Sequence, residues 1–111
     1  MTADVGAQMR KGVVEYCVLG LLAREPMYGW QLADALTESG LIASIGTLYP
    51  LLGRLRDNGW VTTFDQPSDS GPVRRYYRLT DAGVAQLALF RTQWRPFALT
   101  VSRLVGEEVP S

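Results

Sequence analysis

The stretch SIGTLYPLLGRLRDN, residues 44–58, decides the fold. Four leucines in it recur at i, i+3, i+4 and i+7, which is the spacing of one face of an α-helix. These leucines are Leu48, Leu51, Leu52 and Leu55. Either Ser44 or Thr47 can cap the start, and Pro50 then lies in the first or second turn, where a missing N–H is tolerated. The stretch therefore predicts a helix with an apolar face turned to the core.

The opposite face of this helix is low in profile and polar. Because successive residues of an α-helix are rotated by about 100°, the residues at the centre and at the two edges of this face follow from the sequence. The centre is Gly46, Pro50, Gly53 and Asp57, with Thr47 and Arg54 on one edge and Tyr49 and Arg56 on the other. Hydroxyl groups bind phosphate, and arginine reaches phosphate or guanine, so the face suits a recognition helix in a DNA major groove. The alternative is a solvated face, on which Gly53 would cost about 1 kcal/mol relative to alanine.

Two helices are expected before this stretch. Apolar residues between positions 10 and 23 cover most of a helical circumference, which predicts a helix packed on several sides. Glu25-Pro26 should end it, because the residue before proline avoids the helical region. Residues 27–39 predict a shorter helix, with Leu32 and Leu36 on one face and Gly40 as its C-terminal cap. Residues 1–8 carry no period, and we expect a loose arm there.

A β-hairpin is expected after it. The segments WVTTF (60–64) and RRYYRL (74–79) are short and rich in aromatic and β-branched residues or arginine, and the turn-rich segment 65–73 predicts a long loop between them. Alternation along the second strand separates two faces. Arg75, Tyr77 and Leu79 share the face expected to pack inward, and Arg74, Tyr76 and Arg78 share the face offered to a phosphate backbone or minor groove. The alternative is a solvated edge strand whose charges discourage aggregation.

The last segment predicts a helix that starts with Thr80 as its N-cap. Its large apolar residues are spaced 3, 4, 3, 4 and 3 apart, which is a heptad seam. They are Leu87, Phe90, Trp94, Phe97, Val101 and Leu104. Pro96 should bend this helix without ending it. We favour a homodimer over packing against the first helix, because a chain of 111 residues leaves little to cover six large apolar side chains.

The predicted order of elements is three helices, a strand, a loop, a strand and a helix. This is the winged helix-turn-helix arrangement, and the expected fold class is α+β, mainly α. We expect residues 1–80 to form a DNA-binding domain and residues 81–111 a C-terminal dimerisation helix. The alternative is a small α+β domain with another function.

Composition excludes several classes of protein. The chain has one cysteine and no histidine, which rules out a disulfide within the chain, a Cys/His zinc site and a Ser-His or Cys-His nucleophile pair. We therefore expect no enzyme activity, no cofactor and no metal, and we interpret Cys17 as a buried, inert thiol. No apolar run is long enough to cross a membrane and no secretory signal is present, which predicts a cytoplasmic protein.

Charge gives a mixed signal. Eleven basic and eleven acidic side chains give a net charge of +0, which argues mildly against DNA binding. The distribution matters more than the sum, because residues 70–80 hold three arginines and no acid.

Three motifs carry a resemblance to a known family. The runs GTLYPLLGRLRDNGWV (46–61) and GPVRRYYRLTDAG (71–83), with the YG pair at 28–29, resemble the PadR family of transcriptional regulators. The likeness extends over about residues 11–97. It implies a winged helix with a dimerisation helix, and repression at palindromic operators that a small molecule relieves. The short last helix resembles the compact subfamily. Family DNA contacts map onto Tyr28, Gln31, Ser44, Thr47, Tyr49, Pro50, Arg54, Arg74, Arg75 and Tyr76.

The resemblance also implies an effector site. In compact relatives, a tryptophan at the place of Trp94 lines a hydrophobic pocket at the dimer interface that stacks flat aromatic ligands. Trp94, with Phe90 and Phe97, is therefore a candidate site for a small aromatic or hydrophobic effector, and the alternative is simple core packing. The leading hypothesis is a homodimeric DNA-binding repressor. The second is a winged-helix module that binds another protein and no DNA, for which the near-zero net charge speaks.

Overall fold

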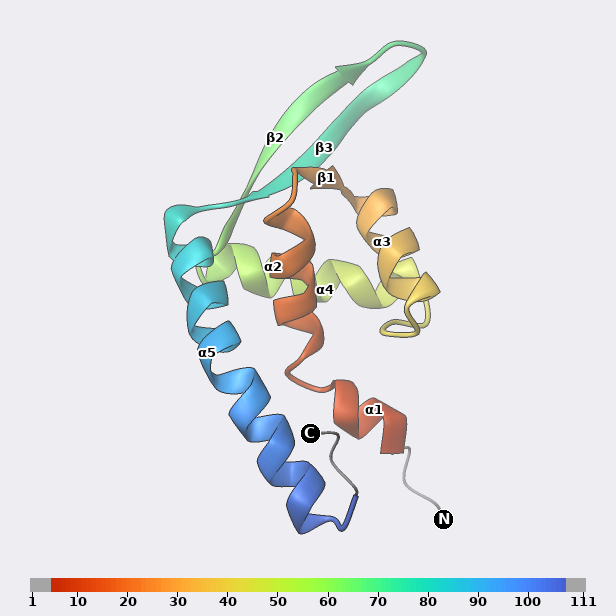
Figure 1. The fold of residues 1–111 in the computed structure, drawn as a ribbon. Helices are drawn as coiled ribbons and strands as arrows, with labels where there is room; N and C mark the ends of the chain where they lie inside the picture. The colour runs from red at the N-terminus through yellow and green to blue at the C-terminus, as the bar shows by residue number, and fades with distance from the viewer. Residues whose placement is uncertain (1–4, 108–111) are drawn as a thin grey trace.

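The computed structural model describes residues 5–107 (Figure 1). In this range a group of helices is followed by a β-hairpin and then by one long helix. The elements are α1 (Val5–Arg10), α2 (Val14–Leu22), β1 (Met27–Tyr28), α3 (Gly29–Glu38), α4 (Ile45–Asp57), β2 (Val61–Ser68), β3 (Gly71–Leu79) and α5 (Asp81–Leu104). The strands form one antiparallel sheet in the order β1-β3-β2. This mainly helical winged helix-turn-helix confirms the predicted fold class.

The leucine face of α4 forms the centre of the core. Leu48, Leu51, Leu52 and Leu55 are each at most 7% exposed. They pack with apolar side chains of α2 and α3, including Val18, Leu19, Leu32 and Leu36, and with Tyr77 of the sheet. Burying a leucine stabilises a fold by about 2 kcal/mol, so this cluster fixes how α4 lies on the two preceding helices. The predicted leucine stripe is confirmed.

The start of α4 resolves the choice between its two candidate caps. Ser44 has the extended conformation of an N-cap residue, with φ −160° and ψ 164°. The Thr47 hydroxyl donates a hydrogen bond of 2.8 Å to the Ser44 carbonyl. Pro50 is the sixth residue of the helix and lies in its second turn, as expected. The helix is therefore continuous through Pro50, although this residue has no N–H to donate to the Gly46 carbonyl.

The N-terminal expectations need three corrections. Residues 5–8, expected in a loose arm, belong to α1, and residues 1–4 lie outside the described range. The helix expected from position 10 begins at Val14, because the chain turns at Gly12, whose φ of 82° favours glycine. Met27 and Tyr28 are not helical but form β1, paired with Tyr77 and Tyr76 of β3. A strand of two residues is stable here because β3, about fifty residues later in the sequence, pairs with it.

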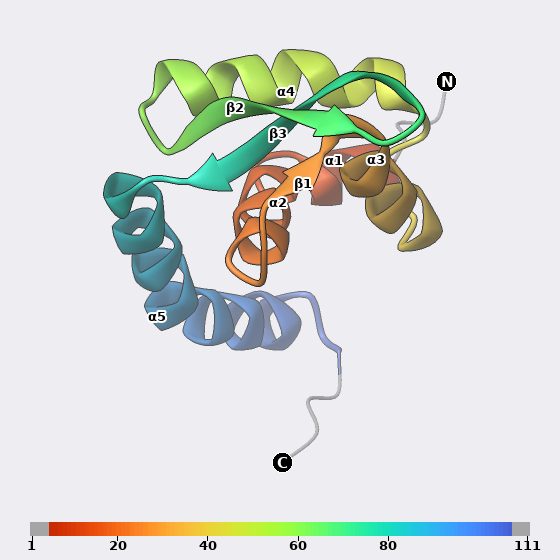
Figure 2. The ribbon, with the colours of Figure 1, turned by 90° about the horizontal axis from the view of Figure 1, so that it is seen from above.

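The predicted long loop in the hairpin is also wrong. β2 runs on to Ser68 and β3 begins at Gly71, which leaves a turn at 69–70. The pairing shifts between Gln66 and Ser68, and this irregularity accommodates Pro67, which has no N–H for the ladder. The Ser68 hydroxyl donates 2.8 Å to the Pro72 carbonyl across the turn. The strands thus form a long wing that extends beyond the helical body (Figure 1), and in the view from above this wing overlies α3 and α4 (Figure 2).

The junction between the wing and α5 is tight. The Thr80 hydroxyl accepts a hydrogen bond of 3.1 Å from the Gly83 N–H and donates one of 2.6 Å to the Gly59 carbonyl, which confirms Thr80 as the N-cap. Gly83 is buried, and a Cβ at this position would overlap the Trp60 carbonyl oxygen. The first turn of α5 is therefore locked against the chain that enters the wing.

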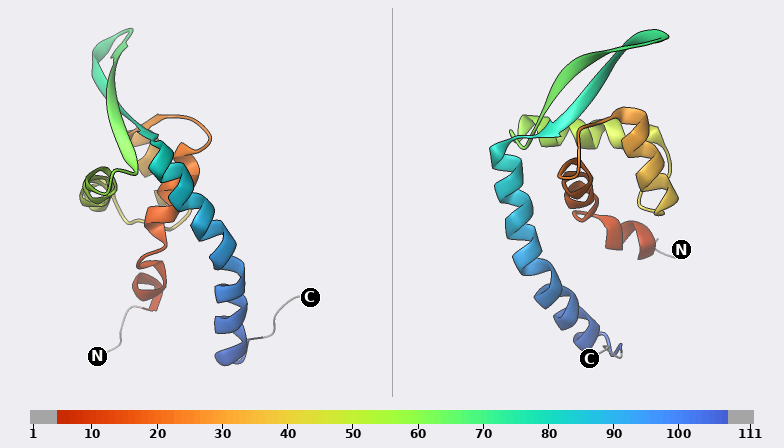
Figure 3. Two further views of the ribbon diagram at one scale, coloured as in Figure 1. Left: turned by 90° about the vertical axis from the view of Figure 1, so that its left-hand side faces the viewer. Right: turned by 45° about the horizontal axis from the view of Figure 1, so that its top comes forward.

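The rest of α5 leaves the helical body. The helix passes through Pro96 without a break, as predicted, and ends at Leu104 (Figure 3). The end of α5 and the tip of the wing point in opposite directions (Figure 1). In the described part of the chain, no helix has both the length and the apolar character needed to cross a membrane. Cys17 is partly buried, and burial raises the pKa of its thiol, consistent with an inert cysteine.

Candidate nucleic-acid interface

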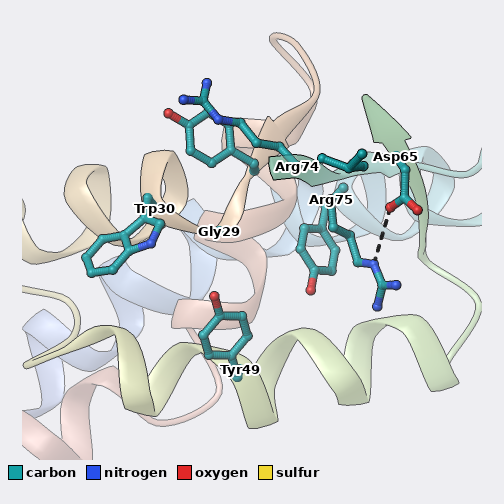
Figure 4. A pocket seen from close by; sticks show the side chains of 9 residues that line it. Gly29, Trp30, Tyr49, Asp65, Arg74 and Arg75 are labelled. Atoms are coloured by element: carbon teal, nitrogen blue, oxygen red, sulfur yellow. Dashed lines mark ion pairs between the residues drawn. The ribbon is translucent and has the colours of Figure 1, made fainter. Parts of the chain in front are cut away.

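Three segments that are distant in the sequence surround one hollow (Figure 4). It has a volume of about 550 Å³ and lies between the start of α3, the exposed side of α4 and the wing. Its lining residues are Tyr28, Gly29, Trp30, Tyr49, Asp65, Val73, Arg74, Arg75 and Tyr77. We call this hollow the wing groove. It brings together four of the predicted contact residues, namely Tyr28, Tyr49, Arg74 and Arg75.

Tyr49 reaches the groove from α4. It is 50% exposed, and its hydroxyl lies beside Gly29 at the start of α3. A Cβ on Gly29 would stand 3.0 Å from the Tyr49 hydroxyl, so a larger residue there would push the tyrosine aside. Gly29 therefore leaves room for the Tyr49 side chain of α4.

Arg74 lies against aromatic residues of the three-stranded sheet. Its guanidinium lies 4.7 Å from the ring centroid of Tyr28, within the range of a cation–π contact. Tyr28 meets Tyr76 edge to face at 5.4 Å, and Tyr76 stacks on Phe64 at 5.5 Å. These rings restrict the place of an exposed cation, which suits it to contact a phosphate backbone.

Arg75 carries an acidic partner in the same groove. Its Nε lies 3.6 Å from Oδ1 of Asp65, which faces it directly across the two strands. Both side chains are 60% exposed, so solvent screens the pair and it adds little to stability. The electrostatic effect on a ligand is larger than the effect on stability, because Asp65 opposes the approach of an anion to Arg75. From the sequence, Asp65 is expected in the loop of the hairpin and is not a predicted site residue.

The inward face of β3 supports the groove from below. Tyr77 is 8% exposed and packs in the core, as the alternation predicted, while Leu79 packs partly buried against it. Burial and the nearby Tyr49 raise the pKa of the Tyr77 hydroxyl, an effect that Arg75 and Arg56 partly oppose. Tyr77 is therefore neutral at physiological pH, and the charges of the groove are those of Arg74, Arg75 and Asp65.

Four other predicted contact residues lie on the exposed side of the helices. Gln31, Ser44, Thr47 and Pro50 are all exposed. The Gln31 side-chain oxygen accepts a hydrogen bond of 3.0 Å from the Tyr28 N–H, so this residue fixes the start of α3. None of these four lines the wing groove.

Arg54 lies apart from the groove. Its Nε donates to Oε1 of Glu15 on α2 at 3.0 Å. With Thr47 it borders a different hollow, of about 350 Å³, between α1, α2 and α4. Arg54 remains 60% exposed, so the pair does not remove it from solvent. Its charge, however, is matched within the protein, unlike that of Arg74.

A second, more apolar site lies along α5. Tyr16 of α2 stacks on Phe90 with 4.3 Å between ring centroids, Phe90 stacks on Trp94 at 5.5 Å, and Trp94 lies 6.4 Å from Phe97. We call these four rings the aromatic ladder. They border a hollow of about 460 Å³ together with Lys11, Gly12, Val13, Gln86, Leu89 and Gln93. The structure thus brings together Phe90, Trp94 and Phe97, the three residues of the candidate effector site.

Tyr16 is a residue of this site that is not predicted from the sequence. In the sequence, Tyr16 fits the apolar pattern of the helix expected between positions 10 and 23, yet its hydroxyl accepts a hydrogen bond of 3.0 Å from the Gln86 side chain. The available signal was an aromatic residue with a polar tip inside an otherwise aliphatic helix.

Comparison with known proteins identifies the family. The profile of the "Transcriptional regulator PadR-like family" matches residues 18–89, from α2 into α5. The chain belongs to the PadR family. The PadR-type regulators are transcriptional regulators and not enzymes, which confirms the expectation that this chain has no catalytic role.

Individual relatives support the same assignment. The transcriptional regulator Rv3488 of Mycobacterium tuberculosis is 35% identical over 80 residues, which cover 72% of this chain and 74% of the relative. The crystal structure of a PadR-like transcriptional regulator from Bacillus cereus superposes with a TM-score of 0.80 at 37% identity, covering 91% of this chain and 99% of that one.

A second PadR structure contains operator DNA. Bacillus subtilis PadR, solved in complex with operator DNA, is 28% identical with a TM-score of 0.63, and the match covers 70% of this chain and 46% of that one. Over the matched part the two chains share a fold, and that relative was solved with its operator DNA.

Proposed function

We propose that this chain is a homodimeric, sequence-specific DNA-binding repressor. The observation that carries the proposal is the wing groove, where Tyr49 of the candidate recognition helix and two wing arginines meet. Arginines that contact phosphates supply affinity for any duplex, and side chains of α4 in the major groove select among sequences. The complex of Bacillus subtilis PadR with operator DNA supports a DNA ligand for the same fold.

Ten residues form the proposed DNA surface. They are Tyr28, Gln31, Ser44, Thr47, Tyr49, Pro50, Arg54, Arg74, Arg75 and Tyr76, and all of them are exposed or partly exposed. Within this set we assign phosphate contact to Arg74 and Arg75, and base contact to Thr47 and Tyr49. Arg54 is paired with Glu15 at 3.0 Å, and Glu15 is less exposed than Asp65, which lies 3.6 Å from Arg75. We therefore expect Arg54 to contribute less than the wing arginines.

The second half of α5 is the proposed dimer interface. Trp94, Phe97, Val101 and Leu104 are 42%, 62%, 41% and 83% exposed, although they continue the seam that begins with buried Leu87. A row of large apolar side chains on one helix face is stabilised by a second copy of that helix. We therefore assign residues 1–80 to DNA binding and residues 81–111 to dimerisation. A two-fold dimer would present its recognition helices to half-sites about 34 Å apart on a palindromic operator.

The aromatic ladder is the proposed effector site. Its rings offer stacking surfaces beside the proposed dimer interface, and the hollow that they border is more apolar than the wing groove. A small flat aromatic or hydrophobic molecule fits this chemistry. Binding there would change how the two copies sit and so would release DNA.

A winged-helix module that binds another protein is the second candidate function. The net charge of +0 favours it, because DNA-binding proteins commonly carry a basic excess. A complex with another protein that is insensitive to salt, without retention of DNA, would distinguish it from the repressor.

Arg75→Ala tests the proposed function, with Arg91→Ala as the matched control on α5. Both arginines are exposed, but only Arg75 lies in the wing groove. We expect Arg75→Ala to weaken binding about tenfold in a mobility-shift titration and to lower the salt slope by about 1, as loss of one phosphate contact does. Arg91→Ala should match the wild type. Equal binding by the two variants would refute the assignment of the wing.

A further inference from the structure

Trp30 is an exposed tryptophan at the edge of the wing groove. It is the second residue of α3, and its side chain is 61% exposed. Figure 4 shows Trp30 at one end of the groove, the Asp65–Arg75 pair at the other, and Tyr49 between them. Trp60, in contrast, packs partly buried against the core. Trp30 therefore does not serve the core, although it is among the largest side chains of the molecule.

The groove around Trp30 offers two kinds of chemistry. The indole supplies a flat apolar surface and one N–H donor, for which the residues from 5 to 107 provide no acceptor. Arg74, Arg75 and the Tyr49 hydroxyl supply cations and a polar group in the same hollow. A ligand that satisfies both must carry negative charges next to apolar faces. A deoxyribose–phosphate strand has this alternation, because apolar faces of sugars lie between its phosphates.

We propose that Trp30 is a DNA-contacting residue. Its ring packs on a deoxyribose of the strand that borders the major groove entered by α4, and its indole N–H donates to an adjacent phosphate. The inference rests on the proposed function and names a contact that the family motifs do not point to. In helix-turn-helix proteins the helix before the recognition helix crosses the DNA backbone, and in this chain that helix is α3.

Two substitutions separate the ring from its N–H group. Trp30→Phe keeps an aromatic ring but removes the donor, whereas Trp30→Ala removes both. Because Trp30 is exposed, both variants should keep the thermal unfolding midpoint of the wild type. Val84→Ala is the control, since Val84 is 56% exposed on α5 and does not line the groove.

The experiment measures binding of each full-length variant to a duplex that the wild type selects from a random library. We expect Trp30→Ala to weaken binding about tenfold, Trp30→Phe to weaken it less, and Val84→Ala to have no effect. The salt slope should stay that of the wild type for all three, because no charge is removed. Addition of the duplex should also quench tryptophan fluorescence of the wild type, and Trp30→Phe should lose most of this change.

The outcomes distinguish the two proposals. Wild-type affinity of Trp30→Ala, or full fluorescence quenching in Trp30→Phe, would overturn the assignment of Trp30 and leave the DNA-binding function standing. A wild-type chain that retains no duplex even at low salt would overturn the proposed function and this inference with it. Salt-insensitive binding of a protein that requires Trp30 would likewise overturn the inference, in favour of a protein partner.

Discussion

The wing and the second half of α5 both expose aromatic residues, but they surround them differently. At the wing, a guanidinium lies over each of two rings, with Arg74 over Tyr28 of β1 at 4.7 Å and Arg78 over Phe64 of β2 at 5.4 Å. Along α5 the rings of Phe90 and Trp94 lie against one another. Rings that carry cations suit a polyanion, whereas rings that continue a row of apolar side chains suit another apolar surface. The contrast supports the proposal that DNA binds at one end of the molecule and a second copy at the other.

The largest expected effect comes from breaking the junction between the two regions. Gly83→Ala places a Cβ against the Trp60 carbonyl, which must move together with the start of α5. We expect the free energy of unfolding to fall by about 3 kcal/mol in a denaturant titration. Gly20→Ala is the matched control, because nothing lies within 4 Å of its Cβ, and it should stabilise α2 by up to about 1 kcal/mol. Equal stability of the two variants would contradict the tight junction.

Phe97→Asp tests the apolar end. A carboxylate in the seam must be desolvated in a dimer, so we expect the dimer to dissociate about a hundredfold more readily in sedimentation equilibrium. DNA affinity should fall with it, since one copy meets one half-site. Thr92→Asp introduces the same charge at an exposed position outside the seam and should remain dimeric. A monomeric wild type would show that the α5 face has another occupant.

Asp65→Asn sharpens the account of the charged end. It removes the acid that pairs with Arg75 and keeps the shape of the side chain. We expect affinity for duplexes of any sequence to rise about threefold, in line with the small energies of exposed ion pairs. Asp81→Asn, outside the groove, is the control. A fall in affinity would mean instead that Asp65 holds Arg75 in its binding position.

The smallest expected effect concerns alkaline pH. The pKa of Tyr77 is raised above its ordinary value of 10.0, so the folded state holds this proton more tightly than the unfolded state. The resulting stability is present below the unfolded pKa and is lost as the pH rises through the raised folded pKa. The unfolding midpoint of the wild type should therefore drop over this range more than that of Tyr77→Phe. Parallel curves for the two proteins would contradict the raised pKa.

Sequence patterns over a few residues predicted correctly those elements that interactions between nearby residues stabilise. The leucine spacing identified α4 because one period serves both the helix and its burial, and Thr80 was recognised as a cap because its partner Gly83 is three residues away. The hairpin loop was overestimated because Pro67 and Gly71 are typical of loops, whereas cross-strand pairing extends both strands past them. β1 could not be foreseen, since it depends on Tyr76 and Tyr77, far along the chain.

The same distinction holds for the functional sites. The arginines of the wing and the rings of α5 stand close together in the sequence, and their composition was enough to single them out. Trp30 and Asp65 lie in one groove only because the wing packs beside α3 and α4, and no pattern of neighbouring residues predicts this packing. The pair Arg54–Glu15 joins residues 39 positions apart and gave no local signal.

A titration of a fluorescent palindromic duplex with the full chain, followed by anisotropy over a series of salt concentrations, tests the central claim most directly. The account predicts saturation at two chains per duplex and an affinity that falls steeply as salt increases, because phosphate contacts of both wings release counterions. Saturation at one chain per duplex would contradict the dimer. Absence of binding at low salt, or an affinity independent of salt, would contradict the assignment of the wing groove to DNA.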